Sequence, residues 1–292
     1  MNKNNIYLLM IITAFFWAGA FIAGKLSAPF IPPFTLTFLR FSVATLVLYG
    51  FIKFKKEKIH KLTKNDFPVF LFTGLVGMFG YHVFFFSALK FTTAISSSII
   101  GATNPIVTTI LSIIFLKDKI TTKRMIGITL SFIGVFLTIT NANFYLLSTL
   151  NFNKGDLLML VAVIMWASYS VFSKWVMPKY SPITLTFYSF LFCTVFIIPF
   201  VIYERPWTLL STIPYYSYIA SVYMSIFASV IGYLVQQISI KQIGPSRTSI
   251  FINLVPVFSI ILSVLILGET ISPIKLLTAL LIIAGVYICQ KG

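Results

Sequence analysis

The chain has 292 residues, of which 58% are hydrophobic and 10% are charged, and its formal net charge is +16. A soluble domain carries about 25% charged residues, so this composition excludes a water-soluble protein, and the long apolar runs indicate that lipid is the main solvent. An excess of cations is also typical of nucleic-acid binding, but no such signature accompanies these cations, and in a membrane protein Lys and Arg report topology.

Charges and clusters of Pro, Gly and Asn divide the chain into roughly ten apolar runs, each about long enough to cross a bilayer. Because the backbone in lipid must satisfy its own hydrogen bonds, we expect every run to be a helix. In chain order the predicted spans are Ile6–Ser27, Pro33–Phe54, Phe67–Leu89, Thr93–Leu116, Arg124–Thr140, Gly155–Trp175, Ile183–Tyr203, Tyr215–Ile240, Ser246–Leu267 and Ile274–Cys289.

The first span contains the stretch GAFIAGKL, Gly19 to Leu26, which differs in one residue from the nucleotide-binding pattern GxxxxGK[ST]. A phosphate loop follows a strand and needs a hydroxyl for magnesium at its last position. Here a predicted helix precedes the stretch and Leu26 occupies that position, so we reject ATP binding and read the small residues as a helix-packing surface. A cleaved signal peptide is also disfavoured, because the apolar run continues past Ala18-Gly19-Ala20.

The Lys and Arg residues are unevenly distributed between the two predicted sides. If the N-terminus is cytoplasmic and ten spans cross the membrane, 16 of the 22 cations lie in internal loops. The positive-inside rule then predicts a multi-pass protein of the cell membrane with both termini in the cytoplasm.

The chain repeats itself. At a shift of 149 positions Trp17 aligns with Trp166, Lys25 with Lys174, and Pro33-Phe-Thr-Leu-Thr-Phe38 with Pro182-Ile-Thr-Leu-Thr-Phe187; at a shift of 151, Pro105 aligns with Pro256 and Gly134 with Gly285. We therefore divide the chain into residues 1–145 and 146–292, with five spans each. Five is an odd number, so the second half enters the membrane from the opposite side, and the fold class is an all-α membrane protein of ten helices in a 5+5 inverted repeat.

These features resemble the EamA branch of the drug/metabolite transporter superfamily. The resemblance rests on the duplicated Pro-x-Thr-Leu-x-Phe entry to the second and seventh spans and on the Pro…Leu-Lys-Asp118 and Pro…Leu-Gly-Glu269 endings of the fourth and ninth. It implies an exporter of amino acids or other metabolites with a central cavity between the halves. The second half departs at Ser189, which stands where the first half has Arg40.

Charged side chains inside a span are candidates for function. Arg40 lies about two turns into the second span, where it could pair with an anionic substrate group, gate, or snorkel to the interface. His82, beside Tyr81, could relay a proton, orient a substrate or simply pack; no Asp or Glu lies deep in a span, so His82 is the only obvious proton carrier if transport is proton-coupled. We interpret Asp118 and Glu269 as structural acids near helix N-termini, with Ser272-Pro273 starting the tenth span.

Several further polar and aromatic residues are candidates for the cavity wall. Asn104 and Asn253 lie beside Pro105 and Pro256, where a proline frees a carbonyl, although interhelical hydrogen bonding is an equal alternative. The full set of substrate-binding candidates is Trp17, Tyr81, His82, Asn104, Trp166, Gln236, Gln237 and Asn253.

The sequence therefore predicts a secondary transporter, with a lipid or isoprenoid carrier of the same architecture as the alternative. No HExxH, GxSxG or paired intramembrane aspartates are present, which argues against an enzyme. Cys193 and Cys289 stand alone and are read as small buried hydrophobes; we expect no metal and no cofactor. The expected partners are a small-molecule substrate and membrane lipid, and the default state is a monomer, with a homodimer compatible with the small-residue stretches.

Overall fold

The computed structural model describes residues 3–117, 121–140, 153–209 and 212–291, and every regular element in these ranges is a helix. The elements are α1 (Lys3–Ser27), α2 (Pro33–Lys55), η1 (Lys64–Asp66), α3 (Phe67–Phe72), η2 (Thr73–Gly80), α4 (Tyr81–Phe91), α5 (Ala94–Gly101), α6 (Asn104–Leu116), α7 (Thr122–Thr140), α9 (Lys154–Val176), α10 (Pro182–Glu204), η3 (Pro206–Thr208), α11 (Tyr215–Tyr223), η4 (Met224–Ile231), α12 (Gly232–Ile243), α13 (Pro245–Ser249), η5 (Ile250–Asn253), α14 (Leu254–Leu262), η6 (Ser263–Leu267) and α15 (Pro273–Gln290).

Eight helical stretches of the described chain are long and apolar enough to cross a membrane, and Pro273–Gly285 in α15 is a shorter apolar helix. Four of the eight run through several consecutive elements, such as η1, α3, η2 and α4 between residues 64 and 91. The prediction of an all-helical membrane protein is confirmed. The predicted fifth span coincides with α7 and the predicted tenth with α15.

Helix starts follow local sequence signals. Ser272 accepts a hydrogen bond from the backbone N–H of Lys275 and Pro273 opens α15, as predicted. Ser181 caps α10 in the same way, again with a proline at the first helical position. These caps satisfy backbone donors that have no acceptor inside the helix.

Two irregularities occur at matching places in the two halves. The π-helical segment η2 covers residues 73–80 and η4 covers residues 224–231, which is a shift of 151 at both ends. Between α5 and α6 the fourth span breaks just before Pro105, and the ninth passes through the 3-10 segment η5 just before Pro256. A proline removes a backbone donor and disfavours the preceding helical turn, which explains both breaks. The repeat in sequence is therefore also a repeat in backbone geometry.

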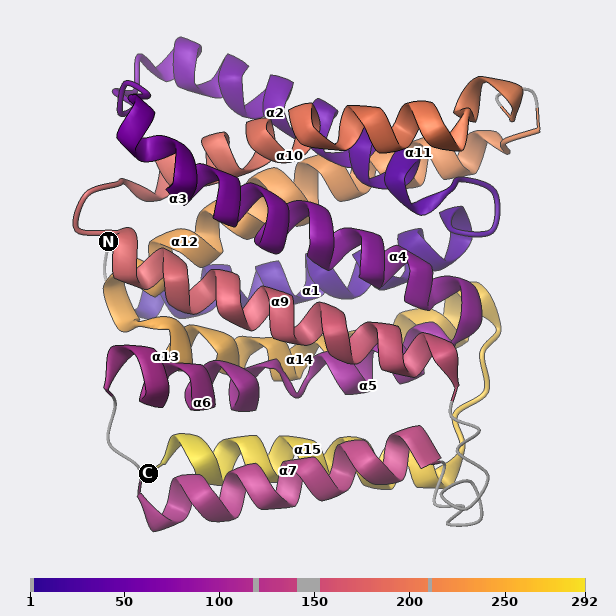
Figure 1. Ribbon diagram of the computed structural model, residues 1–292. Coiled ribbons are helices and arrows are strands. Elements are labelled where there is room, and N and C mark those ends of the chain that lie inside the picture. The colour runs from indigo at the N-terminus through magenta and orange to yellow at the C-terminus, as the bar shows by residue number, and fades with distance from the viewer. Residues whose placement is uncertain (1–2, 118–120, 141–152, 210–211, 292) are drawn as a thin grey trace.

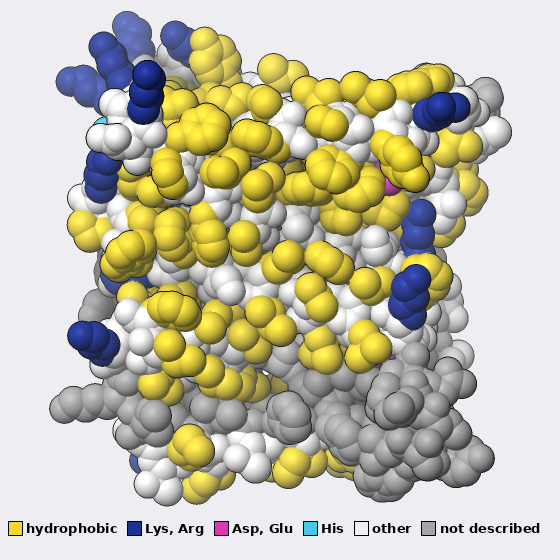
Figure 2. All heavy atoms as spheres, in the orientation of Figure 1, with side chains coloured by type: hydrophobic (Ala, Val, Ile, Leu, Met, Phe, Trp, Pro, Cys, Tyr) yellow, Lys and Arg dark blue, Asp and Glu magenta, His cyan; other side chains and the backbone are white. Residues whose placement is uncertain are grey.

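The helices run side by side along one common direction, and α1 begins at the same end of the bundle at which α15 ends (Figure 1). Equivalent helices of the two halves pack against each other, α2 against α10 and α7 against α15, while α9 packs against α4 and α6 and α1 packs against η4, α12 and α14. On the visible face an apolar belt lies between cations at the two ends (Figure 2). This pattern is the one expected of a protein embedded in a bilayer.

Cationic side chains cap matching helix ends in the two halves. The Lys25 amine donates to the carbonyls of Leu89 and Thr92 at 2.8 and 2.6 Å, at the end of α4. The Lys174 amine donates to the carbonyls of Ile240 and Lys241 at 3.4 and 3.3 Å, near the end of α12. The lysine that both copies share thus neutralises the negative end of a neighbouring helix dipole.

Carboxylates from the second half cap helix N-termini of the first half. Glu204 accepts from the backbone N–H groups of Phe34 and Thr35 at the start of α2. Glu269 accepts from Ala94 and Ile95 at the start of α5. Glu269 therefore has the predicted structural role at a helix N-terminus. The helix that it caps is α5 of the first half, however, and not α15. Asp118, for which the same role was predicted, lies outside the described residues.

A polar cluster joins the halves near the end of the bundle where α2 ends and α3 begins. The buried Asp66 carboxylate accepts from the Lys179 amine and the Tyr180 hydroxyl, each at 2.6 Å, and lies 2.9 Å from His60 Nε2. The hydrogen bond to Asp66 raises the pKa of Lys179 above its usual value.

The small residues of the GAFIAGKL stretch lie at helix contacts inside α1. A Cβ atom at Gly19 would collide with the Tyr223 hydroxyl, and one at Gly24 would lie 2.6 Å from Leu89 Cδ1. The prediction of a packing surface is confirmed. Cys193 is a buried free cysteine, as predicted, whereas the Cys289 side chain lies outside the described part.

Candidate functional site

A closed cavity lies where the two halves meet. Its lining comes from α1, α2, α4, α5, α9, α12, η5 and α14, and comprises Trp17, Ala20, Phe21, Arg40, Tyr81, His82, Phe85, Ser98, Gly101, Trp166, Tyr233, Ile252 and Val255. The volume open to the centre of a water molecule is about 20 Å³, which is room for about one water. The site in this conformation therefore has no room for a metabolite.

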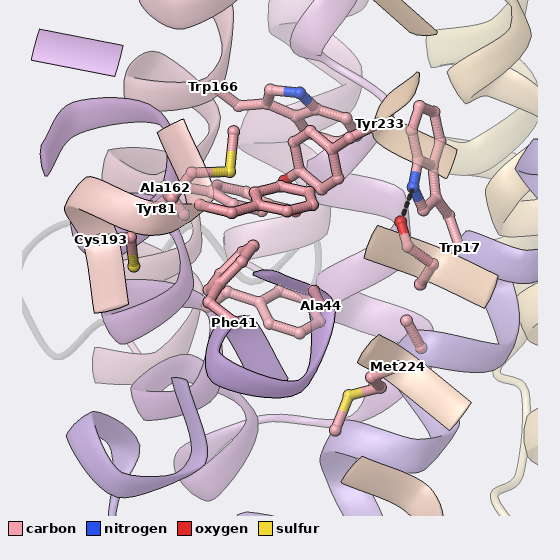
Figure 3. Packing of buried hydrophobic residues seen from close by; sticks show 14 of the residues in the cluster. Trp17, Phe41, Ala44, Tyr81, Ala162, Trp166, Cys193, Met224 and Tyr233 are labelled. Atoms are coloured by element: carbon pink, nitrogen blue, oxygen red, sulfur yellow. Dashed lines mark hydrogen bonds between the residues drawn. The ribbon is translucent and has the colours of Figure 1, made fainter. Parts of the chain in front are cut away.

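Repeat-equivalent residues touch each other beside this cavity. The rings of Trp17 and Trp166 meet edge to face with centroids 5.0 Å apart (Figure 3). The rings of Phe41 and Phe190 also lie 5.0 Å apart. The hydroxyls of Thr45 and Thr194 are 3.3 Å apart. A residue can contact its own equivalent only near the axis that relates the two halves. The pseudo-twofold axis thus passes beside the cavity.

The two tryptophans have different surroundings. Trp17 Nε1 donates to the Ala228 carbonyl of η4 at 3.1 Å, the dashed line in Figure 3. A Cβ atom at Gly232 would lie 2.7 Å from this nitrogen, so glycine is needed for the approach. Trp166 Nε1 is buried without an acceptor among the described residues, and its ring packs on Tyr81 with centroids 5.1 Å apart. The Trp17 indole is thus fixed by a hydrogen bond, whereas the Trp166 N–H has no acceptor among the described residues.

His82 and Tyr233 form another equivalent pair, at a shift of 151. The Tyr233 hydroxyl lies 3.4 Å from His82 Nε2, and His82 Nδ1 lies 2.8 Å from the Met78 carbonyl. The carbonyl can only accept, so Nδ1 carries the proton and Nε2 is left to accept from the tyrosine. The imidazole is thus bonded on both sides, and the π-helical segment η2, in which Met78 lies, sets its direction.

Arg40 is the charged residue of the lining. Its side chain is 3% exposed, and its Nε donates to Ser229 Oγ at 2.7 Å. The ring of Phe41 lies 5.7 Å from the guanidinium carbon. The ion pairs among the described residues join Asp66 to His60 and to Lys179, so no described carboxylate pairs with Arg40. The described residues therefore give this buried cation no counter-ion.

The structure brings together five of the predicted residues, Trp17, Arg40, Tyr81, His82 and Trp166, and places the four predicted amides outside the lining. Asn104 donates to the Val163 carbonyl of α9 at 3.3 Å. Gln237 donates to the Tyr169 hydroxyl at 2.5 Å, and Gln236 to Ser170 Oγ at 3.4 Å. These three amides connect α6 and α12 to α9. Asn253 is buried, and its side-chain oxygen has no donor among the described residues.

Sequence reasoning missed Tyr233, the residue with the most ring contacts inside the site. Its ring lies within 6.5 Å, centroid to centroid, of the rings of Trp17, Phe41, His82 and Trp166. The shift of 151 that aligns Pro105 with Pro256 also aligns His82 with Tyr233, so the repeat contained the signal. The cavity residues Gly101 and Ile252 are likewise equivalent at this shift.

A helical membrane protein built from two equivalent halves, with broken helices around a closed site between them, has the architecture of a secondary transporter. Comparison with known proteins identifies which kind. The chain matches the EamA-like transporter family twice, over residues 4–140 and 153–289, and so belongs to this family of the drug/metabolite transporter superfamily. The resemblance noted from the sequence is confirmed.

Individual relatives agree with the family. The "Uncharacterized transporter YyaM" of Bacillus subtilis is 33% identical over 287 residues, covering 98% of this chain and 93% of that protein. The "Probable amino-acid metabolite efflux pump" of Salmonella typhimurium is 26% identical and covers all of this chain and 96% of its own length. A solved crystal structure, 19% identical, matches 99% of this chain and 98% of its own with a TM-score of 0.73; at this identity the likeness shows the fold alone.

Proposed function

We propose that the protein exports amino acids or related small metabolites, moving them through the closed cavity by alternating access. The observation that carries this proposal is the position of the cavity, beside the axis between two equivalent halves and against the broken fourth and ninth spans. Secondary transporters with inverted repeats place their substrate site at such a point and expose it by rocking one half against the other. The name of the Salmonella relative supports metabolite efflux.

We infer that all ten helices cross the membrane, so that the second half is inverted with respect to the first. In support, α1 begins and α15 ends at one end of the bundle, where the Lys-rich segment after α2 also lies (Figures 1 and 2). The positive-inside rule makes this end cytoplasmic in the cell membrane. Labelling of a cysteine introduced at Lys58 with an impermeant maleimide tests the orientation; modification in intact cells would overturn it.

We assign substrate contact to Trp17, Tyr81, His82 and Trp166, and the charge of the site to Arg40. The predicted amides Asn104, Asn253, Gln236 and Gln237 take a supporting role, because the bonded ones hold α6 and α12 against the helix that carries Trp166. A cavity for about one water cannot hold a metabolite, so binding requires an opened state with more room.

The test is transport by the purified protein in liposomes. A panel of labelled amino acids and metabolites is offered, and saturable uptake or exchange is measured for wild type, Trp17→Ala and His82→Ala. We expect at least one compound to be transported. In Trp17→Ala its kcat/KM should fall tenfold or more, which corresponds to a loss of about 1.4 kcal/mol or more of transition-state stabilisation. Phe54→Ala, at an 81% exposed position on α2, is the control. Absence of transport for every compound, with folded protein, would refute the export function.

A lipid or isoprenoid carrier is the second candidate, and one observation favours it. An apolar groove of about 620 Å³ lies beside α6 and α9, lined in part by Phe115, Phe172 and Trp175. Trp175 is 66% exposed, as a lipid-facing residue would be. Dithionite quenching of a fluorescent phospholipid in the same liposomes separates the two candidates: scrambling without metabolite transport favours the lipid carrier.

A further inference from the structure

We propose that the cavity selects a carboxylate that lacks an ammonium group, such as an aromatic hydroxy or oxo acid, over the corresponding zwitterionic amino acid. This inference rests on the proposed transport function and names the substrate class of the same site.

The first argument is the charge of the site. Arg40 is almost completely buried, and the described residues offer it a serine hydroxyl and an aromatic face but no carboxylate. A buried charge without a counter-ion is costly, and inside a membrane segment such a charge indicates function. The missing anion is supplied most simply by the substrate, because a carboxylate bound to guanidinium makes two charge-assisted hydrogen bonds.

The second argument is where the acids are. The chain has six Asp and Glu residues, and the five described ones are all accounted for away from the cavity. Glu57 is exposed in the segment after α2, Asp66 binds Lys179, Asp156 accepts from Thr92, and Glu204 and Glu269 cap helices. Asp118 is outside the described residues, beyond the end of α6. The described part of the site thus provides no carboxylate partner for a substrate ammonium.

The site would therefore attract the carboxylate of a zwitterion and repel its ammonium. A carboxylate alone brings the net charge of Arg40 plus ligand to zero. An amino acid adds an ammonium and returns that sum to +1 beside a mainly apolar and aromatic wall, where charges are poorly screened. Aromatic faces can hold a cation, but here Arg40 already occupies the same aromatic cluster and would repel it. Selection against the ammonium follows from this like charge.

The third argument is the balance of hydrogen-bond donors. Besides the guanidinium, the lining holds two further donors: Trp166 Nε1, which is buried without an acceptor among the described residues, and the Tyr81 hydroxyl. His82 Nε2, the one nitrogen that could accept, is already faced by Tyr233. A wall with surplus donors matches a ligand that brings oxygen acceptors, and the surrounding rings match an apolar or aromatic body.

The experiment compares three matched compounds in liposomes containing the full chain: 3-phenyllactate, phenylalanine and 3-phenyllactamide. These carry, respectively, a carboxylate alone, a carboxylate with an ammonium, and no charge. We expect kcat/KM for phenyllactate to exceed that for each of the other two at least tenfold. Arg40→Gln, which can keep the bond to Ser229, should abolish the preference of phenyllactate over the amide, whereas Arg40→Lys should keep part of it. Leu46→Ala, a 70% exposed position on the same helix, should leave it unchanged.

The outcomes separate the two proposals. Equal or better transport of phenylalanine overturns the selectivity inference while supporting metabolite transport. Equal transport of phenyllactate and its amide by wild type also overturns the selectivity inference, because the protein would then not distinguish a carboxylate from a neutral amide. An Arg40→Gln protein that folds and still prefers the anion removes Arg40 from the argument. If none of these compounds is transported while other metabolites are, the inference fails alone; if nothing is transported, both fail.

Discussion

Glu204→Gln should destabilise the first turn of α2, and the size of this effect follows from the hydrogen bonds that the Glu204 carboxylate accepts. Oε1 accepts from the Phe34 N–H at 3.1 Å, and Oε2 accepts from the N–H and the hydroxyl of Thr35, each at 2.7 Å. The amide has one acceptor oxygen in place of two, so at least one bond is lost and the remaining bonds lose their charge. Hydrogen bonds to charged groups are worth about 1 kcal/mol more than neutral ones, and the helix dipole adds to the loss.

We therefore expect the first turn of α2 to become less stable by about 2 kcal/mol, which corresponds to a roughly 30-fold change in its opening equilibrium. Hydrogen–deuterium exchange of the Phe34 and Thr35 amides measures this directly, since first-turn amides have no acceptor within their own helix. Glu57→Gln, which changes an exposed glutamate in the same manner, is the control. Exchange within threefold of wild type in Glu204→Gln would show that the carboxylate does not hold the helix.

Three further substitutions test the packing and the contacts between the halves. Gly19→Ala places a methyl group against the Tyr223 ring, and thermal unfolding in detergent should show a loss of about 1–3 kcal/mol; an unchanged melting temperature would contradict the tight contact. Lys25→Met removes two bonds to the end of α4, and exchange at that end should rise about tenfold or more. Lys90→Met removes a cation from the last turn of α4 without removing these bonds, so its effect should be much smaller. Lys179→Met should lower the melting temperature by about 2 °C. The decrease in melting temperature for Lys179→Met should be equal at pH 6 and pH 9, because the raised pKa of Lys179 keeps its amine protonated throughout this range. The stabilisation by Lys179 is lost only as the pH rises through that pKa. A decrease seen at pH 6 but not at pH 9 would contradict the ion pair with Asp66.

The sequence predicted the helices and the tryptophans well for a physical reason. A long apolar run can span the membrane only as a helix. A tryptophan that occurs at the same position of both repeats is easily recognised among the many Leu and Phe residues. Trp17 and Trp166, which line the cavity, could therefore be singled out from the sequence, and so could Arg40, because a charge in an apolar run is conspicuous.

The direction in which polar side chains point could not be predicted in the same way. The π-helical segments η2 and η4 insert extra residues per turn, which rotates everything that follows them relative to a regular helix. Gln236 and Gln237 follow η4 and face α9, while Tyr233, three positions earlier than Gln236, lines the cavity. Helical periodicity alone does not contain this rotation.

The contacts between equivalent residues at the axis distinguish two repeats fused in one polypeptide from a dimer of two identical subunits. In a symmetric pair of separate subunits, any residue beside the axis is present twice, and a buried arginine there would bring a second one near it. Joining the halves in one polypeptide removes that constraint. Serine can then occupy position 189 while arginine occupies position 40, and tyrosine can meet histidine where identical rings would otherwise meet. Covalent fusion thus allows a near-symmetric scaffold to carry one buried arginine, which has no counter-ion among the described residues.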